Sequence, residues 1–144
     1  MRHRKKGRRL GVNAAHRRSM LANMASSLIE HGAINTTDAR ARQLRMFIEP
    51  MITLAKRGDL HARRNVLSHL RNQVAVKRLF DELAPQLTSD GGYTRILKLG
   101  RRKGDSAAIS MIQFAVPEQE TAPAVVPAED EAAVDSAVED AQEG

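Results

Sequence analysis

The sequence predicts an α+β fold in which the helices come first and a β-hairpin follows. Apolar residues recur at helical spacing over four segments between residues 13 and 85. The spacing changes after the turn residues SDGG at 89–92, where two β-favouring runs follow at 93–99 and 107–116. Charge divides the chain as well, so we expect a basic arm (1–12), a folded domain (13–116) and an acidic tail (117–144).

The charge balance is the strongest indication of a partner. All 23 Lys and Arg residues lie at or before Lys103, whereas only 8 of the 17 Asp and Glu residues precede Pro117. Residues 1–116 therefore have a formal charge of +15, and residues 117–144 have a charge of −9. A merely solvated surface would show mixed signs near balance, so this excess predicts a polyanionic partner, with nucleic acid as the first candidate.

The first eighteen residues, MRHRKKGRRLGVNAAHRR, contain eight Lys and Arg residues and no acid. Three interpretations fit this stretch by itself: a targeting peptide, a disordered tail that aids solubility, or an arm that binds a negatively charged partner. The basic excess continues to Lys103, so targeting alone does not account for it. We expect residues 1–12 to be disordered without a partner and to reach about 40 Å when extended.

The first helix is expected from Asn13, a candidate N-cap, to His31. Gly32 follows, and a glycine adopts a positive φ with little energetic cost, which favours a helix end there. The next stretch, Ala33–Thr36, is either a strand or a link. The apolar stripe of this helix consists of Leu21, Met24, Ala25, Leu28 and Ile29.

A second helix is expected from the capping residue Thr37 to residue 58, with Asp38 in its first turn. Arg45 and Glu49 are four residues apart and should pair. Pro50 removes one hydrogen bond and should kink the helix or divide it. The apolar side gathers Leu44, Phe47, Ile48, Met51, Leu54 and Ala55, and the outer side gathers Arg42, Arg45, Glu49, Thr53 and Lys56.

Two shorter helices complete the helical part. Asp59 is a candidate N-cap for the third helix, and Asn72 for the fourth, which has Pro85 near its end. The apolar residues expected to face inward are Leu60, Leu67 and Leu70 in the third helix and Val76, Leu79, Phe80 and Leu83 in the fourth. The methionines at helical spacing are interpreted as core filler: Met20, Met24, Met46 and Met51.

The last part of the domain is interpreted as an antiparallel hairpin with GRRKGDS at 100–106 as its charged tip. Alternation in both strands is too weak to indicate which face is buried. After Pro117 the composition becomes Ala, Glu, Asp, Val and Pro, which predicts a disordered acidic tail. The tail is either an inert solvated extension or a segment that folds back on the basic surface and discourages wrong contacts with a polyanion.

No set of residues predicts catalysis. Cysteine is absent, and no two histidines are spaced three or four apart, so neither a disulfide nor a zinc site is expected. The tip GRRKGDS lacks the Gly-Lys-Ser/Thr order of a phosphate-binding loop, and adjacent Asp81 and Glu82 point in different directions on a helix. The apolar stretches are too short to span a membrane. We expect no enzyme activity, no cofactor, no metal, no small-molecule substrate and no membrane association.

The basic residues gather in four places: the arm, the start of the first helix, the outer side of the second helix with HARR at 61–64, and the hairpin. Most of them are arginines, whose planar fork suits bidentate contacts with phosphate. Three of the four aromatic residues are assigned to the core, which argues against a stacking platform for single strands. This pattern indicates recognition of a folded nucleic acid by its shape and phosphates.

Three ordered blocks of the sequence follow the pattern of a known family. They are MRHRKKGRRLGVNAAHRRSMLANMASSLI, then INTTDARARQLRMFIEPMITLAKRG, and finally GGYTRILKLGRRKGDSA. Over about residues 1–116 the chain resembles the bacterial large-subunit (50S) ribosomal protein seventeen family. The second block is the most specific and fits the family's pattern at Ile34, Thr36, Thr37, Arg40, Ala41, Arg42, Glu49, Met51, Ile52, Thr53, Ala55 and Lys56.

The resemblance implies a two-layer α/β domain in which four helices pack on a small three-stranded mixed sheet, with residues 33–36 as one strand. It also implies a structural constituent of the large ribosomal subunit that binds 23S ribosomal RNA. Such a protein would lie in the cytoplasm on the ribosome, beside neighbouring large-subunit proteins near the peptide exit. The acidic tail departs from the compact family pattern, so no function is carried onto it.

The residues expected to bind RNA combine this resemblance with the charge pattern. A basic DNA-binding or nucleoid-type protein is the alternative, because charge alone does not separate the two. The expected RNA-binding residues are Arg2, Arg4, Lys5, Lys6, Arg8, Arg9, Arg17, Arg18, Arg40, Arg42, Arg45, Lys56, Arg63, Arg64, Lys98, Arg101, Arg102 and Lys103.

Overall fold

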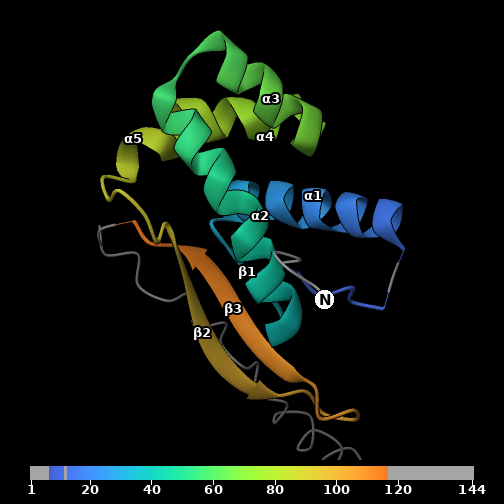
Figure 1. The fold of residues 1–144 in the computed structure, drawn as a ribbon. Helices are drawn as coiled ribbons and strands as arrows, with labels where there is room; N and C mark the ends of the chain where they lie inside the picture. The colour runs from blue at the N-terminus through green and yellow to red at the C-terminus, as the bar shows by residue number, and fades with distance from the viewer. Residues whose placement is uncertain (1–6, 12, 117–144) are drawn as a thin grey trace, which may run out of the picture.

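The computed structural model describes residues 7–11 and 13–116, so the expectations for residues 1–6, for residue 12 and for the tail 117–144 lie outside the described residues. The elements in chain order are α1 (Ala14–His31), β1 (Ala33–Thr37), α2 (Asp38–Arg57), α3 (Leu60–Leu70), α4 (Gln73–Arg78), the π-helical turn η1 (Leu79–Leu83), α5 (Ala84–Gln86), β2 (Thr94–Arg101) and β3 (Ala108–Phe114). Figure 1 shows α2 running along the sheet, with α1 crossing near one end. The expected α+β fold with two layers is confirmed.

The sheet has the order β1-β3-β2, and both of its strand pairings are antiparallel. The mixed sheet implied by the family resemblance is therefore wrong in this respect. The reason is topological: β1 and β2 run in the same direction, but β3 lies between them and keeps them from pairing. The strand expected at Ala33–Thr36 is confirmed and continues through Thr37.

Burial along β3 shows which face of the sheet meets the helices, a point that the sequence leaves open. Ser110, Ile112 and Phe114 are buried, and the residues between them are only half-buried. Ile112 lies at the centre of the sheet, opposite Ile34 of β1 and Ile96 of β2. The two layers therefore meet along one set of alternating residues, as a sheet with helices on a single face requires.

The predicted helix caps are confirmed at three of four positions. Side-chain oxygens of Asn13 and Asp59 accept hydrogen bonds from the N–H groups of the third residues after them, at 2.8 and 3.2 Å. Asn72 accepts from the N–H groups of Val74 and Ala75, at 3.0 and 3.2 Å. Thr37 precedes α2, but its side chain makes no capping bond with the described residues. It is also the last residue of β1, where it pairs with Ile109.

The two prolines inside helices act differently. Pro50 is expected to kink α2 or to divide it; the helix runs without interruption through Pro50, so it is not divided, and the kink stays a prediction. The single helix expected after Asn72 instead widens into η1 immediately before Pro85, where the N–H of Ala84 donates to the carbonyl of Leu79. Pro85 offers no N–H, and its ring would crowd a carbonyl of the preceding turn, which favours the wider turn.

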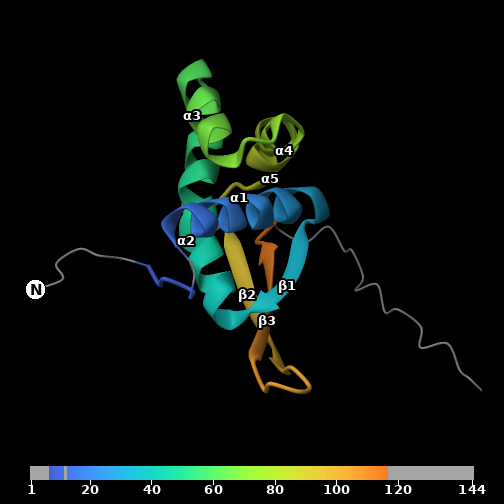
Figure 2. The same ribbon diagram turned by 90° about the vertical axis from the view of Figure 1, so that its right-hand side faces the viewer.

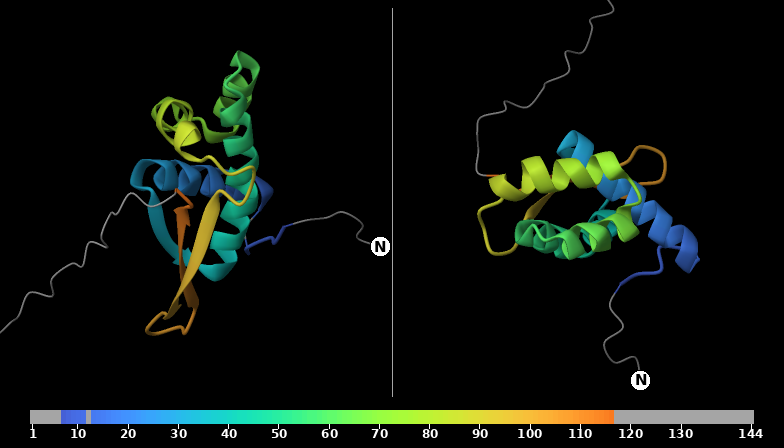
Figure 3. Two further views of the ribbon diagram at one scale, coloured as in Figure 1. Left: turned by 90° about the vertical axis from the view of Figure 1, so that its left-hand side faces the viewer. Right: turned by 90° about the horizontal axis from the view of Figure 1, so that it is seen from above.

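The core lies between the helices and the buried face of the sheet. Figure 3 shows from above how α3 and α4 lie side by side across α1. Two residues predicted to be core are exposed, namely Leu60 at 64% and Met46 at 47%. Leu60 directly follows the cap of α3, whose buried stripe is Ala62, Val66 and Leu70, and Met46 sits beside Arg45 on the outer side of α2. The fully buried large aliphatic residues include Leu28, Ile29, Leu44, Ile48, Ile52 and Leu79.

Two leucines on neighbouring helices differ in burial, so their replacement should change the stability of the domain by different amounts. Leu44 is fully buried, so Leu44→Ala should lower the free energy of unfolding by about 2–5 kcal/mol through lost contacts and a residual cavity. Leu60→Ala is the matched control and should change it by less than about 0.5 kcal/mol. Denaturant unfolding followed by circular dichroism measures both values, and similar losses for the two variants would contradict the assignment of the core.

Candidate nucleic-acid interface

The last residues of the basic arm are held against the domain. The N–H of Arg8 donates to Oε1 of Gln43 on α2 at 3.0 Å, and Nη1 of Arg17 on α1 donates to the carbonyl of Arg9 at 3.3 Å. Gly7 has a φ of 103°, and a Cβ at this position would lie 3.1 Å from Gln43 Oε1. The expected disorder of the arm therefore does not hold for residues 7–11. Sequence reasoning did not find the role of Gln43, because an isolated glutamine on a polar helix face gives no signal.

The hairpin tip is held by an internal ion pair. Nη2 and Nε of Arg102 donate to the two carboxylate oxygens of Asp105 at 2.6 and 3.1 Å. The N–H of Ala107 donates to Asp105 Oδ1 at 3.2 Å, and the N–H of Ser106 donates to the carbonyl of Arg102 at 3.0 Å. The hydrogen bond from Arg102, with that from Ala107, lowers the pKa of Asp105 to about 2. Arg102 thus shapes the turn that carries Arg101 and Lys103.

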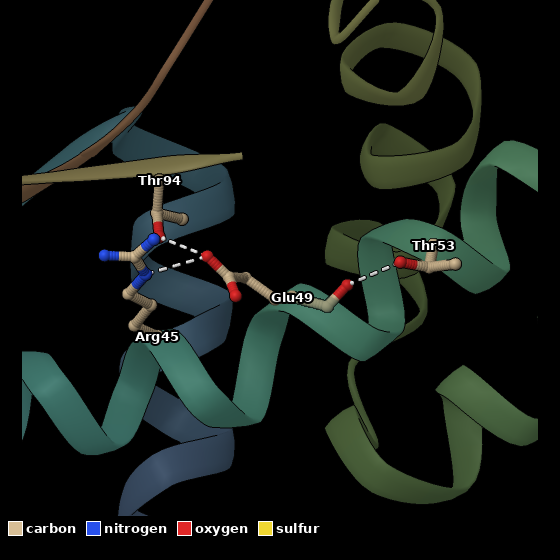
Figure 4. A network of polar contacts seen from close by, with 4 residues as sticks. All are labelled: Arg45, Glu49, Thr53 and Thr94. Atoms are coloured by element: carbon tan, nitrogen blue, oxygen red, sulfur yellow. Dashed lines mark hydrogen bonds and ion pairs between the residues drawn. The ribbon is translucent and has the colours of Figure 1, made fainter. Parts of the chain in front are cut away.

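One carboxylate joins α2 to the sheet beneath its basic side. Oε1 of Glu49 accepts from Nε of Arg45 at 2.9 Å and from the hydroxyl of Thr94, the first residue of β2, at 3.3 Å. Figure 4 shows this group, together with the Thr53 hydroxyl that donates to the Glu49 carbonyl. Thr94 is only 4% exposed. The predicted pair between Arg45 and Glu49 is confirmed, and it also connects two elements.

A second joint lies nearer the start of α2. Asp38 binds Nη2 of Arg42 at 3.0 Å and accepts from the buried hydroxyl of Ser110 on β3 at 3.4 Å. Asp38 therefore links the first turn of α2 to the central strand. Arg42 and Arg45 have exposed guanidinium groups, and exposed pairs of this kind contribute only about 0–1 kcal/mol, so they can open to meet a stronger partner.

The basic residues at the far end of α2 and on α3 have partners within the domain. Lys56 donates to the Ser89 carbonyl and lies 5.2 Å from the centre of the Tyr93 ring. Arg63 binds Asp81 at 2.9 Å and lies 4.9 Å from the centre of the Phe80 ring. These two cations stabilise the packing of the loop after α5 and of η1, whichever partner the protein binds.

The remaining predicted cations have no such pairing. Within the described part of the chain, ten of the predicted residues have no carboxylate within 4.0 Å: Lys56, described above, and Arg8, Arg9, Arg17, Arg18, Arg40, Arg64, Lys98, Arg101 and Lys103. Arg42, Arg45, Arg63 and Arg102 are paired, and Arg2, Arg4, Lys5 and Lys6 lie outside the described residues. Three exposed cations outside the prediction, Arg71, Lys77 and Arg95, also have no carboxylate partner among residues 7–11 and 13–116.

The fold brings most of these cations to one end of the molecule. Figures 1 and 2 show that the arm residues 7–11, the start of α2 and the hairpin tip all lie at the end away from α3. We call this region the basic end and define it as Arg8, Arg9, Arg17, Arg18, Arg40, Lys98, Arg101 and Lys103. Lys56, Arg63 and Arg64 lie toward the other end, so the four predicted basic groups do not form one patch.

Other kinds of site find little support in the described residues. In residues 7–11 and 13–116, no three His, Asp or Glu residues come together in a way that could hold a metal ion. None of the described helices has the length and apolar character needed to cross a membrane. The exposed cations are thus the main chemical feature of the described surface.

Comparison with known proteins gives a consistent result. The family model described as Ribosomal protein L17 matches residues 20–115. The chain is 50% identical to the large ribosomal subunit protein bL17 of Syntrophotalea carbinolica over 139 residues, which cover 96% of this chain and 88% of the relative. It is 52% identical to the protein of that name from Akkermansia muciniphila (89% of this chain, 98% of the relative) and 51% identical to that from Allorhizobium ampelinum (79% and 82%).

The lowered pKa of Asp105 predicts how the tip responds to acid. Because its pKa in the fold lies below the ordinary 3.8, the pairing with Arg102 stabilises the tip above that pH and is lost as the pH falls through about 2. Titration of the Asp105 carboxyl by NMR should show a midpoint near 2, and Arg102→Gln should move the midpoint up toward 3.8. An unchanged midpoint in that variant would contradict the pairing.

Proposed function

The chain belongs to the ribosomal protein L17 family, and on this premise we propose that it is a structural constituent of the large ribosomal subunit that binds 23S ribosomal RNA through its basic end. The main support is the set of eight cations there that have no carboxylate partner within the described residues. No catalytic arrangement is needed for this role, and the family relatives are named as subunit proteins rather than enzymes.

Binding in this proposal relies on phosphate contacts made from a preformed surface. Arg40 and Lys98 project from α2 and β2, and the internal ion pair of the tip orients Arg101 and Lys103. Each phosphate that such a cation meets releases condensed counterions, which gives affinity that falls with salt. Since the surface is already folded, little conformational entropy is lost there on binding.

The arm extends this surface. Gln43 and Arg17 hold its last residues on α1 and α2, so the cations of residues 1–6 would start from a defined point. We propose that the arm reaches between RNA segments and clamps them together. We also propose, from the family resemblance, that neighbouring large-subunit proteins near the peptide exit contact the domain and that the protein works on cytoplasmic ribosomes.

The direct test of the assembly is cosedimentation. The full chain, expressed with a small tag in a bacterium, should sediment with the large subunit and remain there after a wash in high salt. A variant with Arg40, Arg101 and Lys103 all changed to Gln should be lost from the subunit in that wash, because phosphate contacts no longer hold it. A wild-type chain found only in the unbound fraction would overturn the proposed function.

Two exposed lysines test which end of the molecule binds RNA. Lys103→Gln in the tip should weaken binding to large-subunit RNA and reduce the slope of log K against log salt by about 0.7–0.9, the value for one lost phosphate contact. Lys77→Gln on α4 is the matched control, because Lys77 is exposed and lies outside the basic end. Filter binding over a salt series measures both slopes.

Equal losses of RNA affinity in the two lysine variants would show that binding depends on the net charge of the protein and not on the cations of the basic end. Equal affinity of the wild-type chain for duplex DNA and for large-subunit RNA would favour the DNA-binding alternative.

A further inference from the structure

The face of the sheet away from the helices carries an apolar strip that no described element covers. Leu97 of β2 lies directly opposite Met111 of β3, with Ile109 next along β3 on the same face. Leu97 is 39% exposed, and Leu99, in the β-bulge between Lys98 and Gly100, is 53% exposed. We call this region the open sheet face. Contiguous exposed apolar side chains of this kind mark a surface that another segment covers.

Positive charge lies at both ends of the apolar strip. Arg95 is on the same face two residues before Leu97, and it pairs across the sheet with Gln113. The hairpin tip, with Lys103, lies at the other end, whereas Arg101 pairs with Ala108 on the helix side of the sheet. Arg95, Arg101 and Lys103 have no carboxylate partner among the described residues. Along the strands, the order is therefore basic, apolar and basic.

The chain itself contains a segment with the complementary order. Glu118 and Glu120 come first, the apolar run APAVVPA follows at 122–128, and three acids stand at 129–131. This segment belongs to residues 117–144, whose charge is −9 against +15 for the rest of the chain. Glu118 and Glu120 would lie beside Arg95, and Val125 and Val126 would contact the apolar strip. The acids at 129–131 would then lie beside the hairpin tip.

The position where the described chain ends suits this arrangement. The N–H of Ala115 donates to the Tyr93 carbonyl at 2.9 Å, and the N–H of Phe114 donates to the Gly32 carbonyl at 3.3 Å. Val116 thus lies at the end of the sheet near Arg95 and away from the tip. A segment that reverses direction at Pro117 would enter the open sheet face from its Arg95 end.

The segment is also long enough. The stretch from residue 95 to residue 103, most of it in β2, spans at most about 26 Å at the usual rise per strand residue. Residues 118 to 129 could span up to about 36 Å when extended, which leaves slack for the reversal after Val116. The second half of the tail is not needed to reach the tip.

We propose that residues 118–131 fold back across the open sheet face, with Val125 and Val126 on Leu97 and Met111 and the acids at 129–131 beside the hairpin tip. The chain would then cover its own apolar strip and reduce the positive potential of the tip until a stronger polyanion displaces the segment. This contact does not depend on the proposed RNA-binding function, because both of its sides belong to the free chain.

Paramagnetic broadening in the full chain tests the contact without any RNA. The chain has no cysteine, so Ala128→Cys provides a single position for a nitroxide label. Amide signals of Leu97, Leu99 and Lys103 should lose more intensity than those of Arg64 and Ser68 on α3, which serve as internal reference. Equal loss at the two sets, or no loss at either, would overturn the proposal.

A second variant separates a specific contact from general attraction between opposite charges. Val125→Asp combined with Val126→Asp in the labelled chain removes the apolar contact and adds two negative charges. The proposal requires the signal loss at Leu97 and Leu99 to fall, whereas attraction by charge alone would increase it. Loss at these amides that appears only at high protein concentration would show that a second copy covers the face, which also overturns the proposal.

Discussion

The domain has to fold against its own positive charge, and its few carboxylates decide where that repulsion is relieved. Residues 1–116 contain 8 Asp and Glu residues against 23 Lys and Arg residues. Six of these 8 acids form ion pairs within the described residues. Asp38 links α2 to β3, Glu49 links α2 to β2, and Asp81 links η1 to α3. Three of the six paired acids therefore lie where elements meet, and the cations of the basic end have no carboxylate partner among the described residues.

This division of charge gives the paired and the unpaired arginines different roles in the proposed function. Arg45, Arg63 and Arg102 orient neighbouring groups within the protein, whereas Arg40 and Arg101 have no carboxylate partner among the described residues. In the proposed function, the paired residues fix the surface, and the residues without an acidic partner contact phosphate. A fold held by exposed pairs alone would be weak, but the buried apolar residues of the core supply most of the stability.

Local signals predicted much of this structure. The caps at Asn13, Asp59 and Asn72 and the glycine after α1 follow from side-chain chemistry within a few residues, so the sequence was sufficient for them. The exposed position of Leu60, the antiparallel order around β3 and the role of Gln43 depend on residues far away in the chain. For the interface, the polyanionic partner and the set of binding cations stay predictions from the sequence, and only the fold shows that α3 lies apart from the arm and the tip.

The place of β3 in the sheet affects how the protein can be made. β3 is the last strand in the chain, yet it supplies every pairing in the sheet, with β1 on one side and β2 on the other. During synthesis β1 and the helices leave the ribosome long before residue 108, so β1 has no strand to pair with until the domain is almost complete. Contacts between segments so distant in sequence form slowly. The helices consequently have to hold the unfinished chain together, and the edge of β1 stays unpaired until the final residues of the domain emerge.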